Sequence, residues 1–208
     1  NLIDIDIMVN KKLLLFSKNL SKKLNVNKTI DFEKFLTSRI PYKKCEIEVA
    51  NARSESYKEG SRKPEVVKET TIKEDLIRRD FTINSLAVSL NSQNFGELID
   101  PFNGISDLNN SIIKTPSDPD LTFIDDPSRM LRAIRFAAQL QFKIDPNIKK
   151  SISKNKDRLK IVSQERVTSE IIKILKCEKP SIGFYLLKEL DLLELVFPEL
   201  NVMSGIEI

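Results

Sequence analysis

The chain has 208 residues, of which 40% are hydrophobic, and its formal net charge is +4. This length suits one large or two modest domains, and no apolar run approaches the length of a membrane span. Histidine is absent, which excludes Ser-His-Asp and Cys-His catalysis and histidine metal sites. Any catalysis must therefore use carboxylates, Lys, Arg or hydroxyl groups. Cys45 and Cys177 are too few for a disulfide framework and indicate a reducing compartment.

The first predicted element is a strand over residues 2–9 that carries two aspartates. Asp4 and Asp6 are two positions apart, so they project from the same face of a strand. Two convergent carboxylates favour a divalent metal with oxygen ligands between them. An exposed edge strand with alternating charge is the alternative.

A helix over residues 11–24 and two strands over 28–38 and 45–52 are expected next. The strand at 45–52 alternates polar and apolar residues and carries Glu48. If it lies beside the 2–9 strand, Glu48 can meet both aspartates and complete a three-carboxylate site for two Mg²⁺ ions. Taken alone, Glu48 is more typical of a surface residue of a strand than of a metal ligand. Residues 54–74, rich in Ser, Lys, Glu and Gly, predict a mobile loop.

Helical spacing returns from residue 78 to residue 90, and the start of this segment is rich in polar groups. It contains Arg78, Arg79, Asp80 and Asn84. Arginine suits bidentate contact with phosphate, and the amide could reach a ribose hydroxyl. The alternative is a helix N-cap by Asp80 with two solvated arginines.

A short strand at 96–99 and a turn at 100–104 end the mixed part of the chain. From about residue 120 onward the periodicity predicts helices. They are expected at 126–141, 146–158, 164–176 and 181–196. The fold class is therefore α+β, with a head of roughly 115 residues followed by an all-helical part.

The helix expected at 126–141 opens with a third polar cluster. Pro127 suits a first helical turn, with Asp126 near the N-cap, and Arg129, Arg132 and Arg135 recur every three residues. Asp126 and Arg129 could form an ordinary i,i+3 ion pair. They could instead present an acceptor and a fork of donors side by side, as the edge of a base does.

The segment from 143 to 179 holds eleven Lys or Arg against five acids. Such a block is often a solvated helical face, and it also suits a polyanionic partner.

Several motifs in fixed order carry a family resemblance. They are Asp4-Ile5-Asp6, Glu48 with Arg53, Arg78-Arg79-Asp80-Phe81-Thr82-Ile83-Asn84, Asp100-Pro101-Phe102 with Gly104 and Asp107, Asp125-Asp126-Pro127 with Arg129, Arg132 and Arg135, and Glu165-Arg166-Val167. Together they closely resemble the class II tRNA nucleotidyltransferases (CCA-adding enzymes) and the related bacterial poly(A) polymerases. The resemblance covers roughly residues 1–200.

The resemblance implies a polymerase-β-like head, with a mixed or antiparallel sheet, and a helical neck and body. It implies that Asp4 and Asp6 bind Mg²⁺ and that Glu48 is the third carboxylate. It further implies nucleotide contacts by the residues Arg78, Arg79, Asp80, Asn84, Asp126, Arg129 and Arg132. In this family the pair at Asp126 and Arg129 forms Watson–Crick-like hydrogen bonds with incoming CTP or ATP, and Arg132 could contact phosphate.

The resemblance also assigns roles to whole segments. Residues 54–74 match a flexible element that helps the pocket change from C to A, and residues 100–108 match a hinge. Residues 143–179 match the neck and early body, which contact the tRNA backbone. The expected domains are a head at 1–115, a neck with the base pocket at 116–180 and the start of a body at 181–208.

Two departures from the family pattern affect these expectations. Asp125 stands where the family usually has Glu, and the Gly-Gly-x-Val-Arg-Asp segment that precedes the catalytic strand is missing. We therefore expect a fragment of a longer protein, which could be inactive by itself.

The function expected from the sequence is addition of CMP and AMP from CTP and ATP to the 3′ CCA end of tRNA, in the cytoplasm and without a membrane. A poly(A) polymerase is the alternative on the same scaffold, although residues 28–44 lack the Arg-rich strand typical of that branch. A CC- or A-adding specialist and a non-catalytic RNA-binding remnant also remain open. The sequence gives no oligomeric state.

Overall fold

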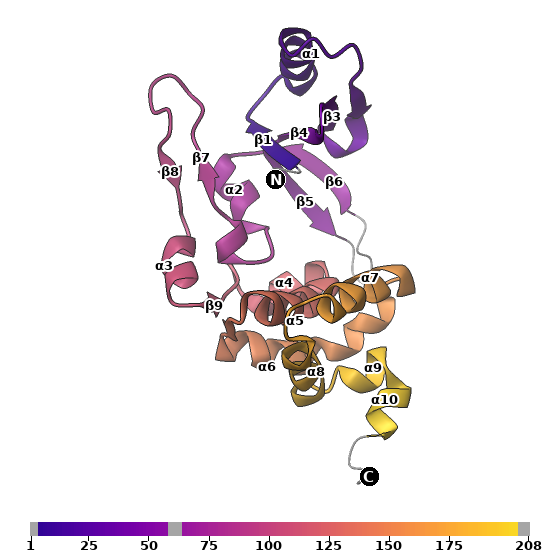
Figure 1. Cartoon of the computed structure of the whole chain (residues 1–208). Coiled ribbons are helices and arrows are strands. Elements are labelled where there is room, and N and C mark those ends of the chain that lie inside the picture. The colour runs from indigo at the N-terminus through magenta and orange to yellow at the C-terminus, as the bar shows by residue number, and fades with distance from the viewer. Residues whose placement is uncertain (1–3, 58–63, 204–208) are drawn as a thin grey trace. The chain divides into compact units, whose positions relative to one another are not determined.

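The computed structural model describes residues 4–57 and 64–203, which divide into two compact units at Arg78 and Arg79 (Figure 1). The first unit contains two β-sheets and two α-helices, and the second is mostly helical. This mixed composition confirms the α+β fold class. The head predicted at 1–115 and the later boundaries at 180 and 208 remain predictions.

The first unit is built on a four-stranded mixed sheet in the order β1-β4-β3-β2. Its strands are β1 (Asp4–Val9), β2 (Ile30–Phe32), β3 (Thr37–Tyr42) and β4 (Cys45–Asn51). β1 pairs with β4 in parallel, whereas β3 pairs antiparallel with both β2 and β4. The helix α1 (Leu13–Lys23) connects β1 to β2 and packs on the sheet.

The sequence explains which face of this sheet α1 covers. Leu13 of α1 packs against a core formed by Ile40, Ile47 and Val49, with Ile5 and other apolar residues at its margin. These strand residues alternate with polar ones, so the apolar side chains share one face of the sheet. The polar side chains of β1 and β4 therefore project from the other face.

Two sequence expectations for this unit were wrong. Residues 28–38 form two antiparallel strands instead of one, because the 3₁₀-helix η1 (Glu33–Phe35) and the left-handed Leu36 (φ 50°) turn the chain back. The segment predicted as a mobile loop at 54–74 forms the hairpin of β5 (Arg53–Tyr57) and β6 (Pro64–Glu69), then α2 (Ile72–Ile77). Residues 58–63 of that prediction lie outside the described residues.

The start of α2 carries a helix-start motif within a segment whose polar composition predicted a loop. Thr71 and Glu74 form a reciprocal capping box, in which each side chain accepts a hydrogen bond from the other residue's backbone N–H. Thr-x-x-Glu before an apolar position is typical of a helix start. The hairpin before it is held by backbone hydrogen bonds, which leave little mark on a polar sequence.

The second unit begins with short elements and continues as helices (Figure 1). The short elements are η2 (Thr82–Asn84), β7 (Ala87–Val88), β8 (Leu98–Ile99), α3 (Gly104–Asn109) and β9 (Ile112–Ile113). The later elements are α4 (Pro119–Asp125), α5 (Ser128–Leu140), β10 (Lys143–Ile144), α6 (Pro146–Asn155), η3 (Lys156–Ile161), α7 (Gln164–Leu175), α8 (Pro180–Glu189), α9 (Leu193–Val196) and α10 (Pro198–Val202).

The central helix of this unit is α5, whose apolar residues recur at helical spacing. Met130, Ile134 and Ala137 are fully buried, and α5 packs against both α7 and α8. A stripe at i, i+4 and i+7 is what a core-facing helix requires. The helices predicted in this region are confirmed with three differences: 126–141 begins at Ser128, 146–158 continues as the 3₁₀-helix η3 after Asn155, and 181–196 is interrupted after Glu189.

The helix expected from residue 78 to residue 90 is wrong. Arg78 ends α2, and only the single turn of η2 follows. The hydroxyl of Thr82 donates to Asp107, and the hydroxyl of Ser85 donates to the carbonyl of Phe81. Side chains that bond locally to the backbone or to distant acids compete with helix formation, and Phe81 is fully buried between them.

The predicted turn at 100–104 is confirmed, and it leads into a tight contact. The carboxylate of Asp100 accepts hydrogen bonds from the backbone N–H groups of Gly104 and Ile105 at 2.7 and 3.0 Å. A Cβ atom on Gly104 would lie 2.3 Å from the carbonyl oxygen of Thr82. Only glycine therefore allows α3 to approach η2 so closely.

We predict that Gly104→Ala lowers the free energy of unfolding by about 1–3 kcal/mol, because the new methyl group must push backbone apart. Denaturant unfolding followed by circular dichroism measures this. Asn109→Ala, at an exposed position of the same helix, should stay within about 0.5 kcal/mol of the parent. Equal stability of the two variants would contradict the packing described for Gly104.

Candidate active site

Parallel pairing of β1 with β4 brings the predicted acidic residues together in the first unit. Asp6 lies opposite Glu48, and Asp4 lies opposite Glu46. Asp4 and Asp6 are exposed while the alternating Ile5 is partly buried, so the aspartates project away from the α1 face. The expectation that the 45–52 strand lies beside the first strand is confirmed.

A cation from the next strand, which the sequence did not single out, lies on the same face. Arg39 of β3 is paired in register with Glu48. Its Nε lies 3.2 Å from Glu48 Oε2 and 3.4 Å from Glu46 Oε1. In the described part of the chain, no three His, Cys, Asp or Glu side chains converge closely enough to hold a metal. The acids are neighbours in the sheet, while Glu48 is engaged by Arg39.

Arg78 is fixed at the end of α2 by a buried carboxylate. Its Nε and Nη2 donate to Asp75 Oδ1 at 3.1 and 2.6 Å, and its Nε also donates to the carbonyl of Arg53. Asp75 is only 2% exposed and also accepts from the backbone N–H of Arg53. The expectation that Arg78 and Arg79 begin a helix was wrong, since Arg78 follows one.

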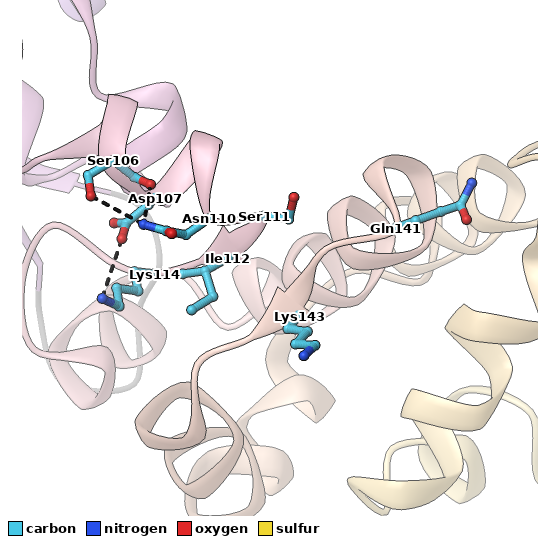
Figure 2. Close-up of a pocket in the computed structure, with 8 residues that line it drawn as sticks. All are labelled: Ser106, Asp107, Asn110, Ser111, Ile112, Lys114, Gln141 and Lys143. Atoms are coloured by element: carbon cyan, nitrogen blue, oxygen red, sulfur yellow. Dashed lines mark hydrogen bonds and ion pairs between the residues drawn. The ribbon is translucent and has the colours of Figure 1, made fainter.

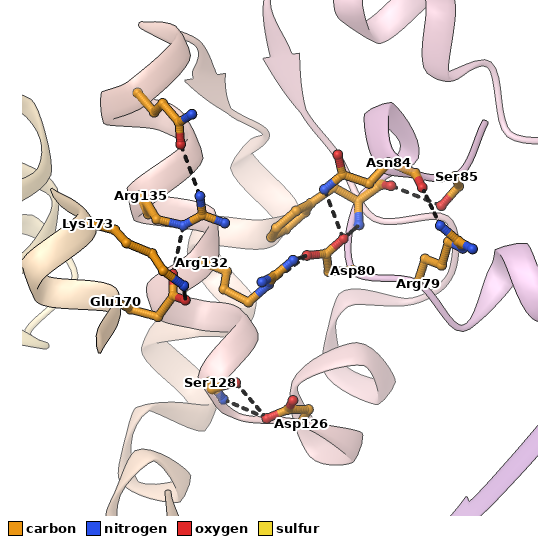
Figure 3. Close-up of polar contacts among 12 residues, drawn as sticks. Arg79, Asp80, Asn84, Ser85, Asp126, Ser128, Arg132, Arg135, Glu170 and Lys173 are labelled. Atoms are coloured by element: carbon orange, nitrogen blue, oxygen red, sulfur yellow. Dashed lines mark hydrogen bonds and ion pairs between the residues drawn. The ribbon is translucent and has the colours of Figure 1, made fainter. Parts of the chain in front are cut away.

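Four predicted site residues of the second unit form one hydrogen-bonded network (Figure 3). Asp80, which is 7% exposed, accepts from Asn84 Nδ2 at 3.1 Å and from Arg132 Nε at 2.7 Å. Arg79 Nη1 donates to the carbonyl of Asn84 at 3.3 Å. Asp80 therefore ties η2 to α5 across 52 positions of sequence, a link that the motifs alone did not reveal.

Asp126 accepts hydrogen bonds from the adjacent turn and from a distant arginine. Its Oδ1 accepts from the backbone N–H and hydroxyl of Ser128, and its Oδ2 accepts from Arg166 Nη2 at 2.7 Å. Arg129 is one turn further on, and its backbone N–H donates to the carbonyl of Asp126. Burial raises the pKa of Asp126, but the hydrogen bonds from Arg166 and Ser128 outweigh it and hold the pKa below its ordinary value. The carboxylate is thus an acceptor at neutral pH.

The arginines of α5 have different partners. Arg132 binds Asp80, whereas Arg135 Nε donates to the buried Glu170 of α7 at 2.7 Å. The guanidinium of Arg135 also lies 4.0 Å from the centroid of the Phe136 ring. Arg135 is therefore a packing residue between α5 and α7. Its guanidinium is largely buried, and a buried charge needs a charged partner, which Glu170 provides.

Three lysines of the basic segment at 143–179 form ion pairs with acids that lie outside it. Lys149 pairs with Glu189, Lys156 with Asp191, and Lys154 with Asp120. Pairs of this kind are mostly exposed and contribute little stability. These three acids lie outside the segment, so they offset part of its positive excess locally, while the net charge of the chain is unchanged.

A hollow of about 400 Å³ lies elsewhere in the second unit, beside α3 and β9 (Figure 2). It is lined by Ser106, Asp107, Asn110, Ser111, Ile112, Lys114, Gln141 and Lys143. None of these belongs to the predicted site residues. Lys114 pairs with Asp107 at 3.3 Å, which occupies one of the two lysines that line it.

No helix in the described ranges, 4–57 and 64–203, is long and apolar enough to cross a membrane.

Two family profiles match successive parts of the chain. The poly(A) polymerase head domain matches residues 1–114. The chain belongs to this family. A second profile, described as a probable RNA- and SrmB-binding site of polymerase A, matches residues 141–203. The family assignment agrees with the resemblance noted in the motifs, including the polymerase-β-like head.

Curated relatives of the family are tRNA nucleotidyltransferases. The A-adding tRNA nucleotidyltransferase of Aquifex aeolicus is 38% identical over 170 residues, which are 81% of this chain and 20% of the relative. The CCA-adding enzyme of Bacillus licheniformis is 44% identical over 130 residues, 62% of this chain and 32% of the relative. The chain therefore spans a fifth to a third of these relatives.

Solved structures of the family match the whole chain. A tRNA nucleotidyltransferase complexed with a primer tRNA and an incoming ATP analog has a TM-score of 0.80 and 32% identity, covering 100% of this chain and 56% of that one. The Thermotoga maritima CCA-adding enzyme complexed with tRNA has a TM-score of 0.79 and 33% identity, covering 96% and 45%. The chain spans about half of these proteins.

We predict that Asp126→Asn makes the free energy of unfolding depend less steeply on pH below neutrality. The pKa of Asp126 is lowered by folding, so its ionised form stabilises the fold above the ordinary aspartate pKa of about 3.9, and this contribution disappears as pH falls through the lowered pKa. Urea unfolding at several pH values from 7 to 3 measures this. The variant should be less stable than the parent at pH 7, with a difference that shrinks on acidification.

The control is Glu194→Gln on α9, which removes a carboxylate outside this contact. A stability difference for Asp126→Asn that is the same at pH 7 and pH 3 would show that the ionised carboxylate is not what stabilises this turn.

Proposed function

We propose that the protein, in its full natural length, is a tRNA nucleotidyltransferase that adds CMP and AMP from CTP and ATP to the 3′ end of tRNA. The observation that carries this proposal is the register of β1 and β4, which sets Asp4 and Asp6 beside Glu48 within a head domain of this family. The names of the similar proteins support the choice of tRNA, CTP and ATP.

We place the reaction centre on the acidic face of the first unit. Enzymes of this family generally use a divalent metal, and hard carboxylate oxygens are the ligands that Mg²⁺ prefers. Asp4 and Asp6 would hold it, and Glu48 would join them after turning from Arg39. When bound, Mg²⁺ supplies charge neutralisation for the triphosphate and a lowered pKa for the attacking hydroxyl.

The remaining predicted residues would bind the nucleotide. Arg78 and Arg79 carry planar guanidinium groups that suit phosphate oxygens. Asp80 and Asn84 are assigned to the ribose, and Arg132, held by Asp80, to a phosphate. Arg78 is firmly positioned, because Asp75 accepts from both its Nε and its Nη2.

Asp126 and Arg129 would select the base. The ionised carboxylate of Asp126 can accept a hydrogen bond from an amino group, which cytosine and adenine both carry at the edge where uracil and guanine carry an acceptor oxygen. Arg129 would donate to the neighbouring ring nitrogen. This chemistry accepts C and A and disfavours U and G, which matches the proposed products.

The test is an incorporation assay with tRNA transcripts that end before CCA, after C or after CC, each incubated with Mg²⁺ and single or paired NTPs. We expect extension by two C and one A, then arrest. Asp6→Asn should lower the rate at least about a thousandfold, because it removes a charged oxygen ligand at the reaction centre. The matched control Glu33→Gln, at an exposed acid of the same unit, should leave the rate unchanged.

Other outcomes identify the alternatives. Addition of A only to transcripts ending in CC indicates an A-adding specialist, and long A tails indicate a poly(A) polymerase. Absence of incorporation by both the parent and Asp6→Asn, with tRNA still bound, would contradict the enzymatic proposal in favour of an RNA-binding role.

A further inference from the structure

The acidic face of the first sheet carries more carboxylates than the proposed metal site uses. Asp4 and Asp6 of β1 lie in register with Glu46 and Glu48 of β4, so four acids occupy two adjacent strands. Like charges directly opposite each other destabilise a sheet. A cation on this face therefore reduces the repulsion between the carboxylates, even when no metal is bound.

Arg39 supplies that cation from the third strand. It is paired in register with Glu48, and its Nε lies within 3.4 Å of carboxylate oxygens of both Glu46 and Glu48. Its guanidinium carbon also lies 5.5 Å from the centroid of the Phe32 ring on β2. The guanidinium is thus held between an aromatic ring and two acids, which limits where it can point.

This contact uses one of the two carboxylate oxygens through which Glu48 could bind a metal ion. Glu48 Oε2 accepts from Arg39 Nε, and in this arrangement the described acids form no three-carboxylate cluster. A divalent cation that attracts the charge of Glu48 towards Asp4 and Asp6 must compete with the guanidinium of Arg39. Metal and Arg39 are therefore competitors for one carboxylate.

We propose that Arg39 is a positioning residue that acts as a built-in counter-cation of the reaction centre, holding Glu48 until a divalent cation displaces it. This inference rests on the proposed function, because it assumes a metal site at Asp4, Asp6 and Glu48. It adds that the chain itself weakens its metal affinity, and it assigns that effect to a residue outside the ligand set.

The size of the effect follows from exposure. The side chains of Arg39 and Glu48 are 45% and 37% exposed, so solvent screens their attraction. Exposed ion pairs of this kind correspond to at most about a fivefold change in an equilibrium constant. Removing Arg39 should therefore tighten metal binding about two- to fivefold.

The experiment measures binding of Mn²⁺ alone by electron paramagnetic resonance, which needs no turnover. Arg39→Gln should lower the dissociation constant of Mn²⁺ about two- to fivefold relative to the parent. Lys44→Gln removes the same charge from an exposed position in the turn between β3 and β4. Because solvent and salt screen such a charge, this variant should change the dissociation constant of Mn²⁺ less than about 1.5-fold. Circular dichroism confirms that each variant is folded.

A double-mutant cycle separates direct competition from general repulsion. In a Glu48→Gln background Arg39 has no charged partner at that position, so Arg39→Gln should no longer tighten Mn²⁺ binding. Tightening of equal size in both backgrounds would overturn the inference, because the effect would then come from charge alone. Weaker binding by Arg39→Gln would also overturn it.

Failure of the proposed function gives a different result. If Asp6→Asn leaves Mn²⁺ binding unchanged, the acidic face is not the metal site, and both proposals fail. If Asp6→Asn weakens binding but Arg39→Gln matches the parent, the metal site stands and only the inference about Arg39 is overturned.

Discussion

Parallel pairing of β1 with β4 is the constraint on which the candidate reaction centre depends. Strand pairing with a period of two determines simultaneously which side chains enter the core and which project from the opposite face. A shift of one residue would bury Asp6 and expose Ile5. The apolar contacts of Ile5, Ile47 and Val49 with the α1 side therefore fix the register that aligns Asp6 with Glu48.

That register sets four carboxylates side by side, and the sheet requires compensation for their repulsion. Burial of the apolar face provides stability, and Arg39 provides local charge balance. A metal ion would provide it more strongly. The same electrostatic demand thus accounts for a structural ion pair and for a proposed metal site, which is why the two compete for Glu48.

In the second unit, partly buried ion pairs join segments that are distant in sequence. Asp80 binds Arg132 across 52 positions, and Asp126 binds Arg166 across 40. Asp80 lies just before η2, and Asp126 lies in the turn between α4 and α5. Breaking such a pair leaves a partly buried charge without its partner, so these contacts specify how the turns are held. The proposed base-selecting pair depends on this arrangement, because Arg166 and Ser128 keep Asp126 ionised and oriented.

The sequence predicted the elements whose signal is a regular period. The alternation in β4 and the helical stripe in α5 were both visible, and the order of the motifs identified the family. The β5–β6 hairpin was missed because most of its residues are polar and its strands are recognised by backbone pairing. The segment after Arg78 was wrongly predicted as helix because the hydroxyl of Thr82 bonds to the distant Asp107 and that of Ser85 bonds to the nearby backbone carbonyl of Phe81.

Site residues were predicted where a motif contained them and missed where only tertiary structure reveals them. Arg39, Asp75, Arg166 and Glu170 act through partners at least three and up to 40 positions away. Of these, only Arg166 lay inside a motif. The pairings of Arg39, Arg166 and Glu170 depend on how strands and helices are arranged, which spacing does not encode, whereas Asp75 and Arg78 form a local i,i+3 pair.

The central claim, that the face shared by β1 and β4 is the metal-dependent reaction centre, is tested most directly by anomalous diffraction. Crystals of the protein would be soaked with Mn²⁺ and a non-hydrolysable CTP analogue. The account predicts an anomalous peak at roughly 2.0–2.4 Å from oxygens of Asp4 and Asp6, with Glu48 turned from Arg39 towards it. A peak at another carboxylate, with Glu48 still bound to Arg39, would contradict it.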